Sequence, residues 1–179
     1  MIKEMVVIFE SANSKFLSEQ KNFILSGVSE RSLCGELMKY LVEEVRKTKF
    51  HKYHVDVEYN RNENRKIKTI MNDREQIINI TCDIIIHSRG ENVIQDNLIA
   101  IEMKKSTNTI SEKNKDRERL IALTKDTFDN IWSYDGKTFP EHVCRYLLGV
   151  YYEINFDSRT ISIEYYKKGE NYHSYQKSF

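Results

Sequence analysis

Two runs of residues, 77–87 and 97–104, constrain the fold of this chain more than any other feature of its sequence. Isoleucine recurs in both runs, and it favours strands because its branched side chain packs well on a pleated surface. The runs are separated by a polar segment that begins Ser-Arg-Gly-Glu-Asn at Ser88, which is typical of a turn. The sequence therefore predicts a hairpin of two core strands.

A clear amphipathic helix is predicted over residues 30–47. Its apolar side chains recur about one helical turn apart, so they form a stripe that can pack on a sheet. Ser29 precedes the first turn and is a suitable N-cap, because its hydroxyl can accept a hydrogen bond from a backbone N–H. The stripe consists of Leu33, Leu37, Leu41 and Val45.

The remaining elements surround this hairpin and helix. Residues 53–59 alternate apolar and polar side chains, the pattern of a half-buried strand, and polar residues 60–76 are predicted to form a long loop or short excursion. The order of elements after the first helix predicts an α+β or mixed α/β fold, with helices flanking a central mixed sheet. The other predicted elements are helices over residues 12–26 and 112–125 and strands over residues 145–156 and 160–168.

Length and composition predict a single globular domain over residues 1–179, since domains typically have roughly 100–200 residues. The net charge of +1 disfavours a protein that coats DNA but allows a nuclease with a local basic rim. Neither a signal peptide nor a membrane-spanning run is recognised, so a soluble cytoplasmic protein is expected. The cysteines Cys34, Cys82 and Cys144 lack metal-ligand spacing and are interpreted as reduced core residues.

Each of the two core strands carries a carboxylate within its apolar run. Asp83 lies in the first strand, Glu102 interrupts the second, and Lys104 lies two residues beyond Glu102 on the same strand face. A carboxylate in an apolar strand is costly unless something satisfies it. Two carboxylates and a backbone carbonyl form a hard oxygen site suited to Mg²⁺. We therefore expect these three side chains to meet in one water-accessible acidic pocket that could hydrolyse a phosphodiester with metal assistance.

A purely structural interpretation stands beside this one. Glu102 and Lys104 could form an internal ion pair, since Glu and Lys are common on strand surfaces. The spacing of Asp83 and the buried-type flanks of both strands favour the catalytic interpretation over that pair.

At this point the sequence resembles the PD-(D/E)xK nuclease superfamily, whose members share a restriction-endonuclease-like α-β-β-β-α-β core. The superfamily's Asp and Glu-x-Lys match Asp83, Glu102 and Lys104, with Cys82 in place of a weakly kept proline. The resemblance covers about residues 29–155, which implies a nuclease core there. It leaves residues 1–28 as a helical extension and 157–179 as a C-terminal hairpin strand. It also implies Mg²⁺ as cofactor, with Mn²⁺ as a substitute.

Members of this superfamily commonly add an acid from the first core helix, and two acids are available. Glu30 lies in line with the apolar stripe, whereas Glu36 lies about a third of a turn away from it. A helix that packs its stripe on the sheet therefore aims Glu30 toward the strands, and we take Glu30 as the third carboxylate. The alternative is that Glu30 only interacts with the helix dipole in the first turn.

Basic and polar residues near these strands are candidates for nucleic-acid contacts. Asn60 and Arg61 follow the strand at residues 53–59, and Lys105 follows Lys104 directly. Phosphate contacts by such side chains supply most sequence-independent affinity. A solvated strand end explains Asn60 and Arg61 equally well, and a solvated helix face explains the basic run over residues 113–119.

The sequence thus predicts a Mg²⁺-dependent nuclease acting on DNA, with RNA less favoured, in a defence, repair or mobile-element setting. A homodimer is a further expectation, since restriction-type nucleases often dimerise to cut both strands. A partner protein is the other, since a chain this short is expected to hold no separate recognition domain. The alternative is a catalytically silent nuclease-fold module that binds nucleic acid or protein.

Overall fold

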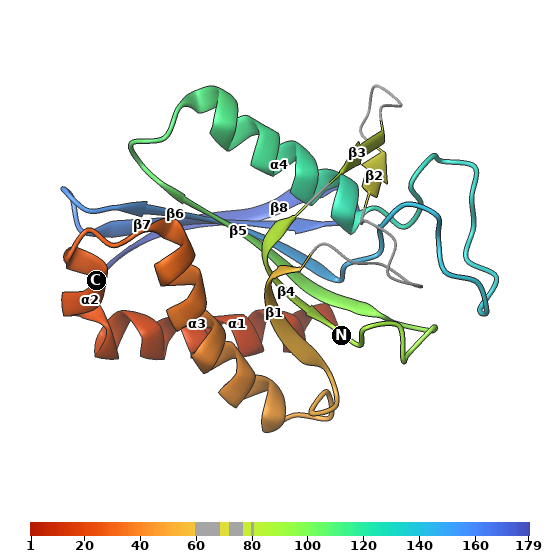
Figure 1. Cartoon of the computed structure of the whole chain (residues 1–179), viewed down its shortest axis with the longest axis horizontal. Coiled ribbons are helices and arrows are strands. Elements are labelled where there is room, and N and C mark those ends of the chain that lie inside the picture. The colour runs from red at the N-terminus through yellow and green to blue at the C-terminus, as the bar shows by residue number, and fades with distance from the viewer. Residues whose placement is uncertain (60–68, 72–76, 80) are drawn as a thin grey trace.

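The computed structural model describes residues 1–59, 69–71, 77–79 and 81–179. A six-stranded sheet with the order β1-β4-β5-β6-β7-β8 forms its centre (Figure 1). Only the β5–β6 pair is parallel among these neighbours, so the predicted mixed α/β class is confirmed. The strands are β1 (His54–Tyr59), β4 (Cys82–His87), β5 (Asn97–Lys105), β6 (Leu148–Asn155), β7 (Thr160–Lys167) and β8 (Glu170–Ser178).

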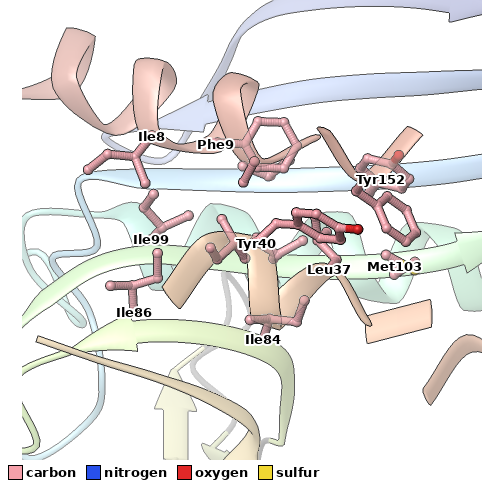
Figure 2. Close-up of a cluster of buried hydrophobic side chains, with 14 of the residues drawn as sticks. Ile8, Phe9, Leu37, Tyr40, Ile84, Ile86, Ile99, Met103 and Tyr152 are labelled. Atoms are coloured by element: carbon pink, nitrogen blue, oxygen red, sulfur yellow. The ribbon is translucent and has the colours of Figure 1, made fainter. Parts of the chain in front are cut away.

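Helices cover both faces of this sheet. The helices α1 (Ile2–Glu19), α2 (Lys21–Leu25) and α3 (Glu30–Arg46) lie on one face, and α4 (Ile110–Thr124) lies on the other (Figure 1). The larger core lies between the sheet and the first three helices. Figure 2 shows it with Phe9 of α1, Leu37 of α3 and Ile84 of β4 packed together.

The helix α3 forms as its sequence predicts. The Ser29 hydroxyl caps it by accepting a hydrogen bond from the backbone N–H of Ser32 at 3.1 Å. All four residues of the predicted stripe are buried, because the stripe packs on the sheet. These residues are Leu33, Leu37, Leu41 and Val45.

The helix α4 connects the parallel strands β5 and β6 across the other face. A capping box at its N-terminus joins Thr109 and Glu112, each side chain bonding the other residue's backbone N–H. Close packing against β6 depends on Gly149, where a Cβ atom would lie 3.0 Å from Thr124 Cγ2. The helix therefore lies directly over the sheet face that carries Glu102 of β5.

The predicted strand over residues 77–87 is wrong in extent. Residues Ile77–Asn79 form a separate strand, β3, which pairs with β2 (Thr69–Met71) in a two-stranded sheet of its own. Only Cys82–His87 joins the main sheet. A continuous apolar run carries no information about which partner each part of it pairs with.

Both ends of the chain contain more structure than hydrophobic periodicity alone assigned. The first helix begins at Ile2 rather than near residue 12, and it buries Met5, Phe9 and Phe16 completely. At the other end β8 forms an edge strand against β7. Most residues of β8 are exposed, so it lacks the apolar alternation by which a strand is recognised.

Candidate metal-binding and active site

The register of β4 and β5 brings Asp83 beside Glu102. Ile84 pairs with Ile101 in the antiparallel ladder, so Asp83 and Glu102 are the next residues outward on the two strands. The Asp83 carboxylate accepts a hydrogen bond from the backbone N–H of Met103 at 2.8 Å. Burial raises the pKa of Asp83 above its ordinary value, although this hydrogen bond opposes the change.

Glu102 is completely buried, with an exposed fraction of 0%. Its Oε1 accepts a hydrogen bond from Arg119 Nη1 at 2.7 Å, whereas its Oε2 has no hydrogen-bond partner within the described part of the chain. The neighbouring Cys82 thiol donates to the backbone oxygen of Ile101 at 3.3 Å. It also interacts with the Glu102 carboxylate, and burial first and then this charge raise the pKa of the thiol. Burial and then the charge of Asp83 raise the pKa of Glu102 to about 8, against the opposing charge of Arg119. The site expected to be open to water is therefore closed at this carboxylate.

Lys104 is held between acids from two helices. Its Nζ lies 2.9 Å from Asp116 Oδ2 on α4 and 3.5 Å from Glu30 Oε2 on α3. The hydrogen bond with Asp116 and the charges of Asp83, Asp116 and Glu30 raise the pKa of Lys104, although burial acts against them. Lys104 is therefore a permanent cation at neutral pH.

The purely structural interpretation expected an internal ion pair between Glu102 and Lys104. Glu102 pairs with Arg119, and Lys104 pairs with Asp116 and Glu30. The internal pair between Glu102 and Lys104 is therefore not the arrangement that the structure shows.

The two acids of α3 lie as the position of its stripe predicts. Glu30 Oε1 accepts a hydrogen bond from the backbone N–H of Lys105 at 3.0 Å, so Glu30 ties the start of α3 to the end of β5. Glu36 instead pairs with Lys39 on the helix surface at 2.5 Å. Glu30 therefore lies beside the candidate site, and Glu36 does not.

Two site residues on α4, Asp116 and Arg119, were missed as such by the sequence analysis, which treated their helix as a solvated basic face. Asp116 is buried, with an exposed fraction of 4%, and Arg119 Nη1 also lies 3.4 Å from Asp116 Oδ1. The available signal was their position one turn before Leu120 and Leu123, which are buried on the same helix. An acid and a base in line with buried leucines face the sheet rather than water.

Much of the basic run proposed to track nucleic acid is engaged within the protein. Arg117 pairs with Glu164 at 2.7 Å, and Lys113 pairs with Glu153 at 2.9 Å. The ammonium of Lys105 lies 5.4 Å from the centre of the Phe156 ring. Asn60 and Arg61, the other two candidate contacts, lie outside the described residues.

The acids of the site are near one another but are not arranged to hold a metal as they stand. Within the described ranges, no group of three or more His, Cys, Asp or Glu side chains is placed to bind one ion together. Asp83, Glu102 and Glu30 nevertheless present carboxylate oxygens, the ligands that Mg²⁺ prefers. The unpartnered Glu102 Oε2 fits such a cation, because a buried oxygen without a partner is costly.

Fold and site together define a mixed α/β protein with a buried acidic cluster at the end of two central strands. Comparison of the chain with family models, with curated proteins and with solved structures finds no match. Over the described residues, no helix has both the length and the apolar character that crossing a bilayer demands.

Proposed function

We propose that this chain is a Mg²⁺-dependent nuclease that hydrolyses phosphodiester bonds of DNA, with RNA as the less favoured substrate. Asp83 and Glu102 would hold the metal, with Glu30 at the edge of the same site, and Mn²⁺ would substitute for Mg²⁺. The proposal places this site within a restriction-endonuclease-like core of the PD-(D/E)xK type. The order α3, β1, β4, β5, α4, β6 in the main fold supports that core.

The observation that carries the proposal is the state of Glu102. A purely structural acid in a fully buried position is expected to have both oxygens satisfied. Glu102 satisfies one oxygen through Arg119 and leaves Oε2 without a partner among the described residues, next to the carboxylate of Asp83. Two neighbouring buried carboxylates repel each other, and a divalent cation would remove that repulsion.

In the proposed reaction the cation and the side chains of the protein have different roles. A bound Mg²⁺ supplies water activation and offsets the negative charge that builds on the phosphate. Lys104 keeps its proton, because its acidic neighbours raise its pKa. It therefore acts through its positive charge, orienting the attacking water and stabilising the phosphate in the transition state, rather than as a general base. Asp116 positions Lys104 for this role.

Arg119 would compete with a cation for Glu102. Its guanidinium holds Oε1 and leaves Oε2 without a partner among the described residues, so a cation that binds through both oxygens would have to displace Arg119. The side chain of Arg119 is 25% exposed, so it has access to solvent toward which it can rotate. Binding of a cation through both Glu102 oxygens would therefore exchange the Arg119 pair for the metal.

The test is cleavage of double-stranded and single-stranded DNA and of RNA with and without Mg²⁺ or Mn²⁺. The wild type is compared with Asp83→Asn and with the matched pair Glu30→Gln and Glu36→Gln on one helix. We expect Asp83→Asn to abolish cleavage, Glu30→Gln to reduce it, and Glu36→Gln to leave it unchanged. A crystal soaked in Mn²⁺ should show anomalous signal between Asp83 and Glu102. Full cleavage by Asp83→Asn would end the proposed mechanism.

A second candidate function is a silent nuclease-fold module that binds nucleic acid or protein without cutting. The ion pairs of Glu102 with Arg119 and of Lys104 with Asp116 favour it, because they satisfy the site without a metal. Titration with Mn²⁺ separates the two functions. Binding that is lost in Asp83→Asn selects the nuclease, and the absence of binding in the wild type selects the silent module.

A further inference from the structure

A pocket of about 520 Å³ lies away from the acidic cluster, at the other end of α3. The end of α3, the turn that leads into β1, the start of β1 and the turn after β4 form its walls. The volume is within the roughly 300–1,000 Å³ range of small-molecule sites. Its charged lining residues and histidines are Arg46, His51, Lys52, His54, Arg89 and Glu91.

The lining of this pocket is strongly cationic, although the chain as a whole is nearly neutral. Arg46 and Lys52 form no ion pair with any residue that the structure describes. Neighbouring lysines on the same surface behave differently, since Lys47 lies 2.8 Å from Glu44 and Lys49 lies 2.7 Å from Glu4. The charges of Arg46 and Lys52 are therefore uncompensated among the described residues, and with Arg89 they outnumber Glu91, the one acid in this lining. A surplus of positive charge of this kind favours an anion.

Arg89 is held in position from behind the pocket. Its Nε donates to Asp56 Oδ2 at 2.8 Å, and its Nη2 donates to Asp56 Oδ1. Asp56 also contacts His87 Nε2 at 3.0 Å, so its carboxylate is fixed from two sides. A guanidinium has five N–H donors, and the side chain of Arg89 is 44% exposed. It can therefore offer further donors to an anion without leaving Asp56.

Part of the pocket lining is apolar, which suggests a ligand larger than a simple anion. Val42, Val45 and Val55 contribute to it together with Tyr53. The Tyr53 hydroxyl donates to the backbone oxygen of Gln95 and accepts from Asn92 Nδ2 at 2.9 Å, so its ring is fixed in place. A fixed aromatic ring beside aliphatic side chains suits a flat organic group, while the cations around it suit a phosphate.

The pocket is separate from the proposed metal site. Glu30 opens α3 beside Lys104, and Arg46 closes the same helix at the pocket. At a rise of about 1.5 Å per residue, these two ends of α3 lie roughly 24 Å apart. A ligand of mononucleotide size cannot reach both places.

We propose that this pocket binds a nucleotide, with its phosphate group held by Arg46, Lys52 and Arg89 and its base against Tyr53 and the valines. The nucleotide is either free or the phosphorylated end of a nucleic-acid strand. Both sources present the same chemistry to the pocket, a phosphate ester attached to an aromatic base.

Binding is tested by calorimetry in metal-free buffer with adenosine monophosphate, inorganic phosphate and adenosine. Fluorescence anisotropy then compares a short single-stranded oligonucleotide with and without a terminal phosphate. The variants are Arg46→Ala and Lys52→Ala, both at exposed positions. Lys47→Ala is the matched control, because Lys47 follows Arg46 directly but pairs with Glu44.

We expect adenosine monophosphate or the phosphorylated oligonucleotide to bind, and each pocket variant to weaken that binding about tenfold, the effect of losing one charge-assisted hydrogen bond. Lys47→Ala and the distant Asp83→Asn should bind like the wild type, which keeps this outcome independent of the nuclease proposal. Binding of the mononucleotide assigns a free ligand, and binding of the phosphorylated strand alone assigns a strand end. Equal affinity for adenosine, unchanged affinity in both pocket variants, or no binding of any probe at millimolar concentration would overturn the proposal.

Discussion

Arg119 Nη1 on α4 lies 2.7 Å from Glu102 Oε1 on β5, so the fully buried acid of the site is hydrogen-bonded by a residue of the helix that covers it. The pairing occupies one carboxylate oxygen and leaves the other without a partner in the described part of the chain. Access of a cation to Glu102 therefore depends on Arg119. Removing Arg119 therefore tests whether Glu102 belongs to a metal site that Arg119 blocks or to a site that is only structural.

Arg119→Ala should raise the affinity for Mn²⁺ about tenfold, because it removes the cation that competes for Glu102. The metal-free protein should lose about 2–3 kcal/mol of unfolding free energy, since a buried carboxylate would be left unpaired. Isothermal titration with Mn²⁺ and urea denaturation measure the two effects. Arg117→Ala is the control, because Arg117 precedes Arg119 by two residues but pairs with Glu164. Unchanged or weaker Mn²⁺ binding in Arg119→Ala would contradict the competition.

Asp83→Asn should stabilise the metal-free protein while abolishing cleavage. The asparagine oxygen can still accept the hydrogen bond from Met103, so only the charge is lost. Because the folded state raises the pKa of Asp83, its charged form costs stability at any pH above roughly 4. We expect a gain on the order of 1 kcal/mol at neutral pH. Mg²⁺ should raise the melting temperature of the wild type and leave that of the variant unchanged. A variant less stable than the wild type in metal-free buffer would count against repulsion between the acids.

Sequence reasoning succeeded where the signal is local. The helix α3 follows from its apolar period and from the Ser29 cap, and both lie within the helix itself. The same period oriented Glu30 toward β5 and Glu36 toward the flank of the helix, and the contacts of the two acids agree, since Glu30 bonds Lys105 and Glu36 pairs with Lys39. The pairing of β4 with β5 followed from two apolar runs separated by a turn.

Sequence reasoning failed where a partner is distant or a signal was read too narrowly. The partner of Glu102 is a long side chain on the next helix, and neither residue's neighbours in the sequence indicate their contact. Residues 77–79 belong to another sheet because pairing is a choice between distant strands. The start of α1 was detectable, since Met5, Phe9 and Phe16 are spaced for one helical face.

Lys104→Met should reduce cleavage at least about a hundredfold while leaving Mn²⁺ affinity within about threefold of the wild type, because its charge acts on the phosphate rather than on the metal. Lys104→Arg keeps the charge beside Asp116 and should restore part of the rate. Single-turnover cleavage and Mn²⁺ titration of the same preparations give the two quantities. If Lys104→Met cleaved at the wild-type rate, Lys104 would have only its structural role as the partner of Asp116 and Glu30.

The pKa of Glu102 predicts how stability changes with pH in metal-free buffer. Burial and the charge of Asp83 raise this pKa from its ordinary 4.5 to about 8. Between these two values the folded protein keeps a proton that the unfolded chain has lost, so the unfolding free energy falls as pH rises through this window. Glu102→Gln removes that titration. The unfolding free energy of the variant, relative to that of the wild type, should therefore rise by on the order of 2–4 kcal/mol from pH 5 to pH 9. Urea denaturation at intervals of pH measures the difference, with Glu36→Gln as a surface control that should follow the wild type. If the plots of unfolding free energy against pH were parallel for Glu102→Gln and the wild type, Glu102 would stay charged throughout, held so by Arg119. The buried acid would then carry no exchangeable proton at neutral pH.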